Sequence, residues 1–295
     1  MLIIGPHVNR EKESIIDSIK ESIKNAPIDI RVVAIFVGQT RARVIILKED
    51  EQIELKKFIH DSKVKVIAHS SYVASPWNGN PAAITYIKKE INVCCNAGIS
   101  GLVVHLPKKD SKTVIKYLTK LDLDEEIHAH FTIYLETPAV IPKETYYETP
   151  EKINALFKEI HDAKFKLQYG ICVDTAHIWT SGESIQSYES AKEWFSKLKV
   201  DKIMIHLNDS ARPLGTGPDK HESLMKGYIW RDYRLPTIVD KYNLQSSNKH
   251  KKIDECGIHA ILEFAKENSI PIILERPSTD MLVNDYEILL KIKII

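Results

Sequence analysis

Residues 170–177, Gly-Ile-Cys-Val-Asp-Thr-Ala-His, contain a short apolar run that ends in an acid, with a histidine three residues later. A short apolar run without polar alternation is typical of a strand buried on both faces. Similar runs recur along the chain. We expect eight strands, at 2–8, 32–37, 65–69, 101–106, 132–136, 170–174, 202–207 and 271–275.

Longer amphipathic stretches separate these runs. They predict helices near 11–25, 50–62, 81–97, 111–121, 150–161, 187–198, 254–268 and 281–292. Eight successive strand–helix units predict an α/β fold, a single-domain (β/α)8 TIM barrel over residues 1–295, with its active site at the C-terminal strand ends. A doubly wound open sheet is the competing fold, but the sequence contains no G-x-G-x-x-G turn for it.

The composition describes an ordinary globular protein. A hydrophobic content of 43% is enough for one large core, and a net charge of +1 excludes a polycation, so contact with nucleic acid needs a local patch. The four cysteines form no C-x-x-C pair, which favours a reducing intracellular compartment, nucleus or cytoplasm. Neither a secretory signal nor a membrane-spanning run is evident, and we expect a monomer.

Side chains of the types that bind metals recur at the ends of the predicted strands. Because these ends meet at one mouth of a barrel, the side chains should converge on one pocket. Burying so many ionisable groups without cations would cost several kcal/mol each, and His with carboxylates suits zinc or manganese. The candidates are His69, His105, Glu136, Asp174, His177, His206 and Glu275, with Asp219 and His221 after a Gly/Pro loop.

Three further features point to nucleic acid. Arg41 follows the second strand and Tyr72 follows His69, so both lie in loops at the active-site mouth. The stretch 208–252 is too long for a typical connection and is predicted to be irregular and functional. Its part from 220 to 252 has eight Lys/Arg against three acids, with interleaved aromatic residues, which suits phosphate contact and stacking. A solvated loop over a hydrophobic helix end is the open alternative.

The chain resembles the endonuclease IV family of zinc-dependent apurinic/apyrimidinic endonucleases along nearly its whole length, and less strongly the members found in large DNA viruses. A viral member would act at a cytoplasmic replication site or in the virion. The matching segments are 5–8, 68–72, 170–177, 206–210, 217–224 and 273–275. There are departures: His105-Leu106-Pro107 stands where the family has His-Pro-Gly, and Arg276 follows Glu275 where threonine is commoner.

The resemblance implies three zinc ions and a hydrolase that nicks duplex DNA 5′ to an abasic site. The ends left would be a 3′-hydroxyl and a 5′-deoxyribose phosphate, and the nucleophile would be a zinc-bound hydroxide. Arg41 and Tyr72 would enter the minor groove. The basic stretch, and not the resemblance, predicts that Lys249, Lys251 and Lys252 contact DNA. By the same resemblance, His69, His105 and Glu136 would hold one zinc; Glu136, Asp174, His206 and Glu275 a second; and His177, Asp219 and His221 the third.

The competing function is a divalent-metal sugar isomerase or epimerase on the same type of barrel. Such an enzyme would use Glu136, Asp174, His206 and Glu275 with one or two metal ions. It leaves the other five candidate ligands and the basic stretch without a role.

Overall fold

Eight parallel strands close into a barrel in the computed structural model, which describes residues 1–122, 131–139, 146–234 and 251–292. Around the barrel the strands follow the order β1–β12–β7–β6–β5–β4–β3–β2. The TIM-barrel prediction is confirmed, and no strand end is displaced by more than two residues. The strands are β1 Ile3–Val8, β2 Val32–Phe36, β3 Lys65–His69, β4 Gly101–His105, β5 Thr132–Glu136, β6 Gln168–Asp174, β7 Ile203–His206 and β12 Pro271–Leu274.

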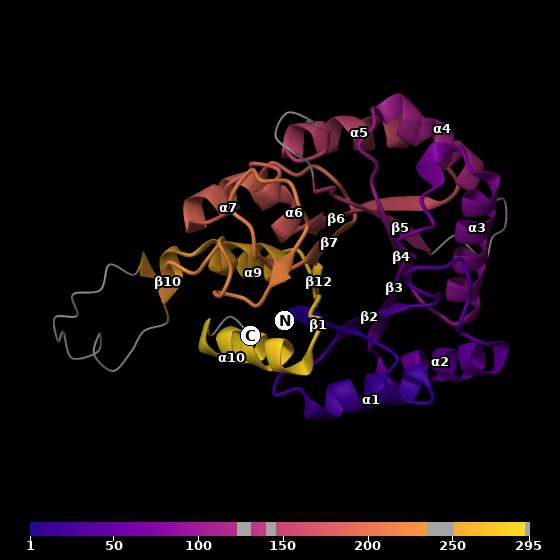
Figure 1. Ribbon diagram of the computed structural model, residues 1–295, viewed down its shortest axis with the longest axis horizontal. Helices are drawn as coiled ribbons and strands as arrows, with labels where there is room; N and C mark the ends of the chain where they lie inside the picture. The colour runs from indigo at the N-terminus through magenta and orange to yellow at the C-terminus, as the bar shows by residue number, and fades with distance from the viewer. Residues whose placement is uncertain (123–130, 140–145, 235–250, 293–295) are drawn as a thin grey trace.

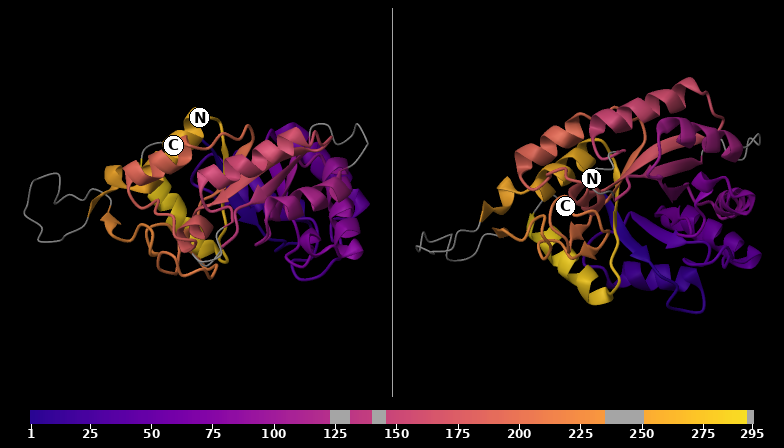
Figure 2. Two further views of the ribbon diagram at one scale, coloured as in Figure 1. Left: turned by 90° about the horizontal axis from the view of Figure 1, so that it is seen from above. Right: turned by 45° about the horizontal axis from the view of Figure 1, so that its top comes forward.

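Helices form an outer layer around the strands (Figures 1 and 2). The eight predicted helices are present as α1 Ile15–Asn25, α2 Glu49–Ser62, α3 Pro81–Asn96, α4 Ser111–Leu121, α5 Pro150–Asp162, α7 Tyr188–Ser196, α9 Gly257–Glu267 and α10 Thr279–Ile292. The predicted start near residue 11 was wrong, because Ser14 caps α1 by accepting a hydrogen bond from the N–H of Asp17.

Among the described residues, two short helical elements were not predicted, α6 Thr175–Thr180 and η1 Pro76–Asn78. A third, η3 Ile253–Glu255, overlaps the start of the helix predicted over 254–268. In the described part of the chain, no helix combines the length and the apolar character needed to cross a membrane. All four cysteines are free thiols, as the absence of a C-x-x-C pair suggested.

The core has two layers. Most buried apolar side chains pack between the strands and the helices. The barrel interior is filled by a smaller cluster, and β1 lies so close to β2 that a Cβ on Gly5 would sit 1.7 Å from the carbonyl oxygen of Val32. The interior cluster consists of Val32, Ala34, Ile67, Val103, Cys172, Met204 and Ile273.

Strand register brings the polar strand ends to one level. His105 pairs with Glu136 across β4 and β5, and Asp174 pairs with His206 across β6 and β7. Because the strands are parallel, all their last residues face the same mouth. The site described below therefore follows from register as well as from sequence.

The described parts of the stretch 208–252, residues 208–234 and 251–252, are less irregular than predicted. An antiparallel ladder joins β8 (Asp209–Ser210) to β9 (His221–Glu222), and a parallel ladder joins β10 (Tyr233–Arg234) to β11 (Lys251–Lys252). The first ladder pairs Ser210 with His221, so it returns the chain to the barrel mouth and places that imidazole there. Two-residue strands carry too little pattern to be recognised in the sequence.

Candidate metal centre

All nine side chains predicted to bind metal lie at the C-terminal mouth of the barrel. Six end a barrel strand or follow its last residue, one lies in α6, and two come from β9 and the segment before it. Seven of the nine line a small cavity of about 260 Å³. Its lining residues are His69, Tyr72, His105, Glu136, His177, Asp219, His221 and Glu275.

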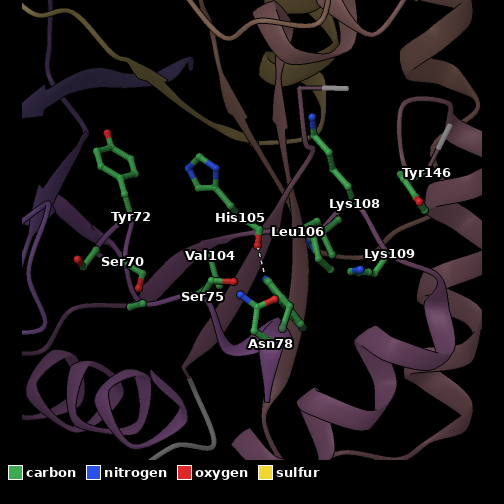
Figure 3. A pocket seen from close by; sticks show the side chains of 14 residues that line it. Ser70, Tyr72, Ser75, Asn78, Val104, His105, Leu106, Lys108, Lys109 and Tyr146 are labelled. Carbon is green, nitrogen blue, oxygen red and sulfur yellow. Dashed lines mark hydrogen bonds between the residues drawn. The ribbon is translucent and has the colours of Figure 1, made fainter. Parts of the chain in front are cut away.

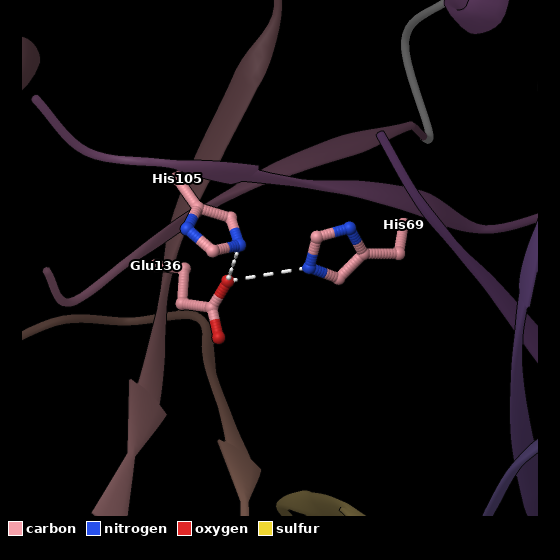
Figure 4. A group of neighbouring side chains, drawn as sticks. All are labelled: His69, His105 and Glu136. Atoms are coloured by element: carbon pink, nitrogen blue, oxygen red, sulfur yellow. Dashed lines mark hydrogen bonds and ion pairs between the residues drawn. The ribbon is translucent and has the colours of Figure 1, made fainter. Parts of the chain in front are cut away.

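Glu136 lies at the centre of this cluster and is 1% exposed. Its Oε2 is 3.3 Å from Nε2 of His69 and 2.9 Å from Nε2 of His105 (Figure 4). Its Oε1 lies 2.8 Å from Nδ1 of His206. The two oxygens of one carboxylate thus face two different groups of imidazoles, which is the arrangement a bridging ligand needs.

Asp174 divides its two oxygens between structure and site. Oδ1 accepts hydrogen bonds from the N–H groups of Ala176 and His177, at 2.7 and 3.0 Å, and so caps α6. Oδ2 faces the cavity, 3.4 Å from Nε2 of His221. Asp174 therefore joins the group around Glu136 to a further group that includes His177 and His221.

Asp219 faces both histidines of that further group. Its Oδ2 is 3.2 Å from Nε2 of His177, and its Oδ1 is 3.1 Å from Nε2 of His221. The Asp219 side chain is 44% exposed, whereas those of Asp174 and His206 are fully buried. The cluster is therefore closed at its base and open to solvent on the Asp219 side.

Backbone carbonyls fix the orientation of two imidazoles. Nδ1 of His69 lies 2.8 Å from the carbonyl oxygen of Ser70, and Nδ1 of His177 lies 2.8 Å from that of Thr137. A carbonyl only accepts, so each Nδ1 carries a proton and each Nε2 is left as the atom that would offer its lone pair to a metal ion once the ring is neutral. This is the usual way in which proteins orient histidines that bind metals.

The electrostatics of the cluster favour charged groups. Burial lowers the pKa of His177, but Asp174 and Asp219 outweigh it and raise that pKa to about 10. Burial likewise raises the pKa of Glu136, yet His105 and His206 hold it well below the usual range for a glutamate. Protons on the imidazoles therefore supply positive charge at positions where a cation could supply it instead.

The donor atoms fit a metal ion. Nε2 of His105, His177 and His206 are shielded from solvent and make no hydrogen bond with acceptable geometry. The first two nevertheless approach carboxylate oxygens at 2.9 and 3.2 Å. Imidazole nitrogens and carboxylate oxygens that lie this close without aligned hydrogen bonds suit a cation between them, and imidazole with carboxylate is a typical donor set for zinc.

Cys172 is a neighbour of the cluster that the sequence did not indicate. Its Sγ lies within 4.8 Å of ligand atoms of Glu136 and His206. Burial raises the pKa of this thiol to about 12, so it stays protonated near neutral pH. The other three groups of possible metal ligands among the described residues consist of imidazole and carboxylate alone.

Asn208, also missed from the sequence, holds two carboxylates of the site. Its Nδ2 donates to Oδ2 of Asp174 at 2.7 Å and to Oε2 of Glu275 at 3.2 Å. Its Oδ1 accepts from Nη1 of Arg276 at 2.6 Å, which fixes the orientation of the amide. His7 of β1 lies against the other oxygen of Glu275, with Nδ1 3.7 Å away.

Arg276 continues this network into the scaffold. Its guanidinium forms a buried ion pair with Asp285 of α10 and donates to the carbonyl of Leu207 at 3.1 Å. The two side chains are 1% and 0% exposed. The residue at which the chain departs from the resembled family is thus a structural support for Asn208 and Glu275.

The loops that carry Arg41 and Tyr72 are joined by hydrogen bonds. The hydroxyl of Ser71 lies 3.1 Å from the carbonyl oxygen of Thr40, and the N–H of Tyr72 donates to the same oxygen at 3.0 Å. Buried Glu90 of α3 accepts from the Ser71 N–H at 3.2 Å. Arg41 is exposed, and Tyr72 is 58% exposed beside the metal cluster.

The basic stretch is only partly described. Lys249 lies outside the described residues, Lys251 lies in β11, and Lys252 is exposed. The idea that the interleaved aromatic residues offer free stacking surfaces is wrong for Trp230 and Tyr233, which are 0% and 3% exposed. Both belong to the hydrophobic core, and Nε1 of Trp230 donates to the carbonyl oxygen of Ile185 at 3.3 Å.

The chain is similar to proteins of one family. A family model described as "Xylose isomerase-like TIM barrel" matches residues 26–235. An African swine fever virus protein named "Probable AP endonuclease" is 35% identical over 250 residues, 82% of this chain and 77% of the relative. "Probable endonuclease 4" of Mycoplasmopsis pulmonis is 32% identical over 292 residues, 95% of each chain.

A solved structure gives the same result in three dimensions. "The crystal structure of AsfvAP:AG" superposes with a TM-score of 0.84 at 30% identity, covering 98% of each chain. Sequence similarity and the barrel therefore agree over almost the whole length. The chain belongs to the xylose isomerase-like TIM barrel family and, within it, to the group that holds the endonuclease 4 proteins.

Proposed function

We propose that this protein is a zinc-dependent DNA-repair endonuclease. It would cut the phosphodiester 5′ to an abasic site in duplex DNA and leave a 3′-hydroxyl and a 5′-deoxyribose phosphate. The observation that carries the proposal is the set of overlapping ligand groups joined through Glu136 and Asp174 at an open barrel mouth. The names of the relatives, AP endonuclease and endonuclease 4, support the same activity.

The nine ligands would hold three zinc ions in the groups implied by the resemblance. When bound, zinc lowers the pKa of water to near neutrality and neutralises charge on phosphate oxygens. The chain supplies the rest: Glu136 bridges two groups, Asn208 fixes two carboxylates, and buried His206 closes the base. The phosphate would enter from the side of His105 and Asp219, whose side chains are 41% and 44% exposed.

The size of the cavity supports selection for a missing base. Its volume of about 260 Å³ lies below the roughly 300–1,000 Å³ typical of pockets for drug-sized ligands. A sugar–phosphate unit without a base suits such a space better than a whole nucleotide does. An abasic unit also has no base to unpair, which reduces the cost of extruding it from the duplex.

DNA contact would come from the rim. Arg41 and Tyr72 lie on two joined loops beside the cavity, and Tyr72 packs edge-on against His69 and His105. Their position suits insertion into the minor groove next to the extruded unit. Lys249, Lys251 and Lys252 would add phosphate contacts, so neutralising all three should flatten the salt dependence of DNA affinity.

A sugar isomerase or epimerase is the second candidate, because Glu136, Asp174, His206 and Glu275 form one compact ligand group. Metal content separates the two functions. About three zinc ions per chain fit the nuclease, whereas one or two manganese ions fit the isomerase.

The direct test is incubation of zinc-loaded protein with a duplex that carries one tetrahydrofuran abasic analogue. Incision on the 5′ side of the analogue, and not in the undamaged duplex, is expected. Glu136→Gln should abolish incision because it removes the shared charge, whereas the matched change Glu151→Gln on the exposed face of α5 should leave it intact. An uncut abasic duplex beside an active control enzyme would reject the proposal.

A further inference from the structure

A second cavity lies beside the metal centre, between the ends of β3 and β4. We name it the β3–β4 pocket; its volume is about 620 Å³ (Figure 3). Tyr72 and His105 line both this pocket and the cavity at the metal centre. Their ring centroids are 5.8 Å apart, so the two spaces are separated by one layer of side chains.

The chemistry of the pocket differs from that of the metal centre. Its described lining contains two lysines, Lys108 and Lys109, and no acid. The metal cavity, by contrast, includes three carboxylates, Glu136, Asp219 and Glu275. A space with ammonium groups and without carboxylates attracts an anion.

The remaining lining suits a nucleotide. Figure 3 shows Tyr72 and Tyr146 on opposite sides of the pocket, with Lys108 extending toward the same side as the imidazole of His105. Ser75 and Asn78 add a hydroxyl and an amide. Aromatic rings beside cationic groups bind successive units of a nucleic-acid strand, with the rings stacking on bases or sugars.

The pocket is built on a rigid wall. Nε1 of Trp77 donates to the carbonyl oxygen of His105 at 2.7 Å, and Trp77 is 4% exposed. This bond joins η1 to the end of β4. Leu106 and Pro107, at which the chain departs from the His-Pro-Gly sequence of the resembled family, form part of the same lining.

We propose that the β3–β4 pocket binds the nucleotide next to the abasic position on the cleaved strand, with Lys108 and Lys109 at its phosphate. This inference rests on the proposed function. Each DNA strand carries one charge per about 3.4 Å of helix axis. A strand with one phosphate at the metal centre would therefore bring the next one to the adjoining pocket.

The test compares Lys108→Gln and Lys109→Gln with Lys89→Gln, an exposed lysine of α3 outside the pocket. Loss of one charged hydrogen bond should raise KM for the abasic duplex roughly tenfold, with a smaller change in kcat. The slope of log KM against log salt concentration should fall by about one. Lys89→Gln should match the unchanged protein in both measurements, with the zinc content of all four proteins equal.

Methylphosphonate substitution locates the phosphate. A neutral linkage on one flank of the lesion should raise KM of the unchanged protein as much as Lys108→Gln or Lys109→Gln does, and should add nothing further to that variant. The proposal is overturned if the neutral linkage and the lysine substitution multiply each other's effect on KM whichever flank carries the linkage. It is also overturned if the lysine variants keep the KM of the unchanged protein. If the unchanged protein does not cut abasic DNA, the proposed function fails separately. In that case, fluorescence anisotropy with a labelled, uncut abasic duplex measures DNA affinity directly. Equal affinities of the unchanged protein and the three lysine variants would reject the proposed role of the pocket.

Discussion

The buried ion pair between Arg276 and Asp285 allows a prediction that does not depend on catalysis. Asp285→Leu leaves the Arg276 guanidinium without its partner at a site where both side chains are at most 1% exposed. An arginine cannot discharge by losing its proton, so the full cost of an unpaired buried charge applies, about 3–5 kcal/mol. In Arg276→Met, the unpaired charge of Asp285 should destabilise the protein by less than this, because the carboxyl can become neutral by taking up a proton. Burial already raises the pKa of Asp285.

The double variant Arg276→Met/Asp285→Leu removes both charges together. Its loss of stability should fall short of the sum of the single losses by at least about 2 kcal/mol, since neither partner remains unpaired. The assay is urea unfolding of the zinc-loaded protein, followed by circular dichroism and tryptophan fluorescence, whose transitions must coincide for two-state analysis.

The exposed pair Lys158–Asp162 on α5 is the control, with side chains 77% and 58% exposed. Its coupling should be below about 1 kcal/mol. Additive losses at Arg276 and Asp285, within about 0.5 kcal/mol, would refute the view that the pair acts as one unit.

Three other changes have defined outcomes. Ser71→Ala removes a bond between the two loops at the barrel mouth and should raise KM for abasic DNA severalfold, while Ser62→Ala at the exposed end of α2 should not. Burial raises the pKa of Glu90 from 4.5 to about 7, so at this group the folded state binds more protons than the unfolded state between these pH values. As pH rises through this range, Glu90 should lower the free energy of unfolding by up to about 3 kcal/mol, and Glu90→Gln should remove this contribution from the slope measured in urea titrations. In metal-free protein, Asp174 and Asp219 raise the pKa of His177 from 6.5 to about 10, so the free energy of unfolding should fall as pH rises through this range. Zinc affinity, measured by competition with a chromogenic chelator, should rise over the same range because fewer protons compete with the metal. An affinity that does not change with pH would contradict this account.

Much of the fold could be predicted because its signals are local. Apolar runs of four to seven residues define the barrel strands, and a polar residue at or just after the end of six of the eight strands indicates where the mouth lies. Asp174 and His206 are examples: each ends its strand, and register alone brings them together. These features need no knowledge of distant contacts.

The supporting network could not be predicted because its partners are distant in sequence. Asn208 contacts Asp174 and Arg276, which lie 34 and 68 residues away. A weak signal exists: Glu90 and Asp285 are acids within the buried stripes of α3 and α10. An acid at such a position requires a buried partner, but the sequence does not identify the partner.

The distribution of the predicted metal ligands over the barrel has a consequence for assembly. They begin at His69 on β3 and end at Glu275 after β12, so the site exists only when early and late segments of the chain have met. Zinc held by the complete set would act as a latch between the first and last parts of the polypeptide, favouring the closed ring over any partly opened form. The metal content of a preparation would then indicate how much of the protein has a closed barrel as well as how much has an assembled active site.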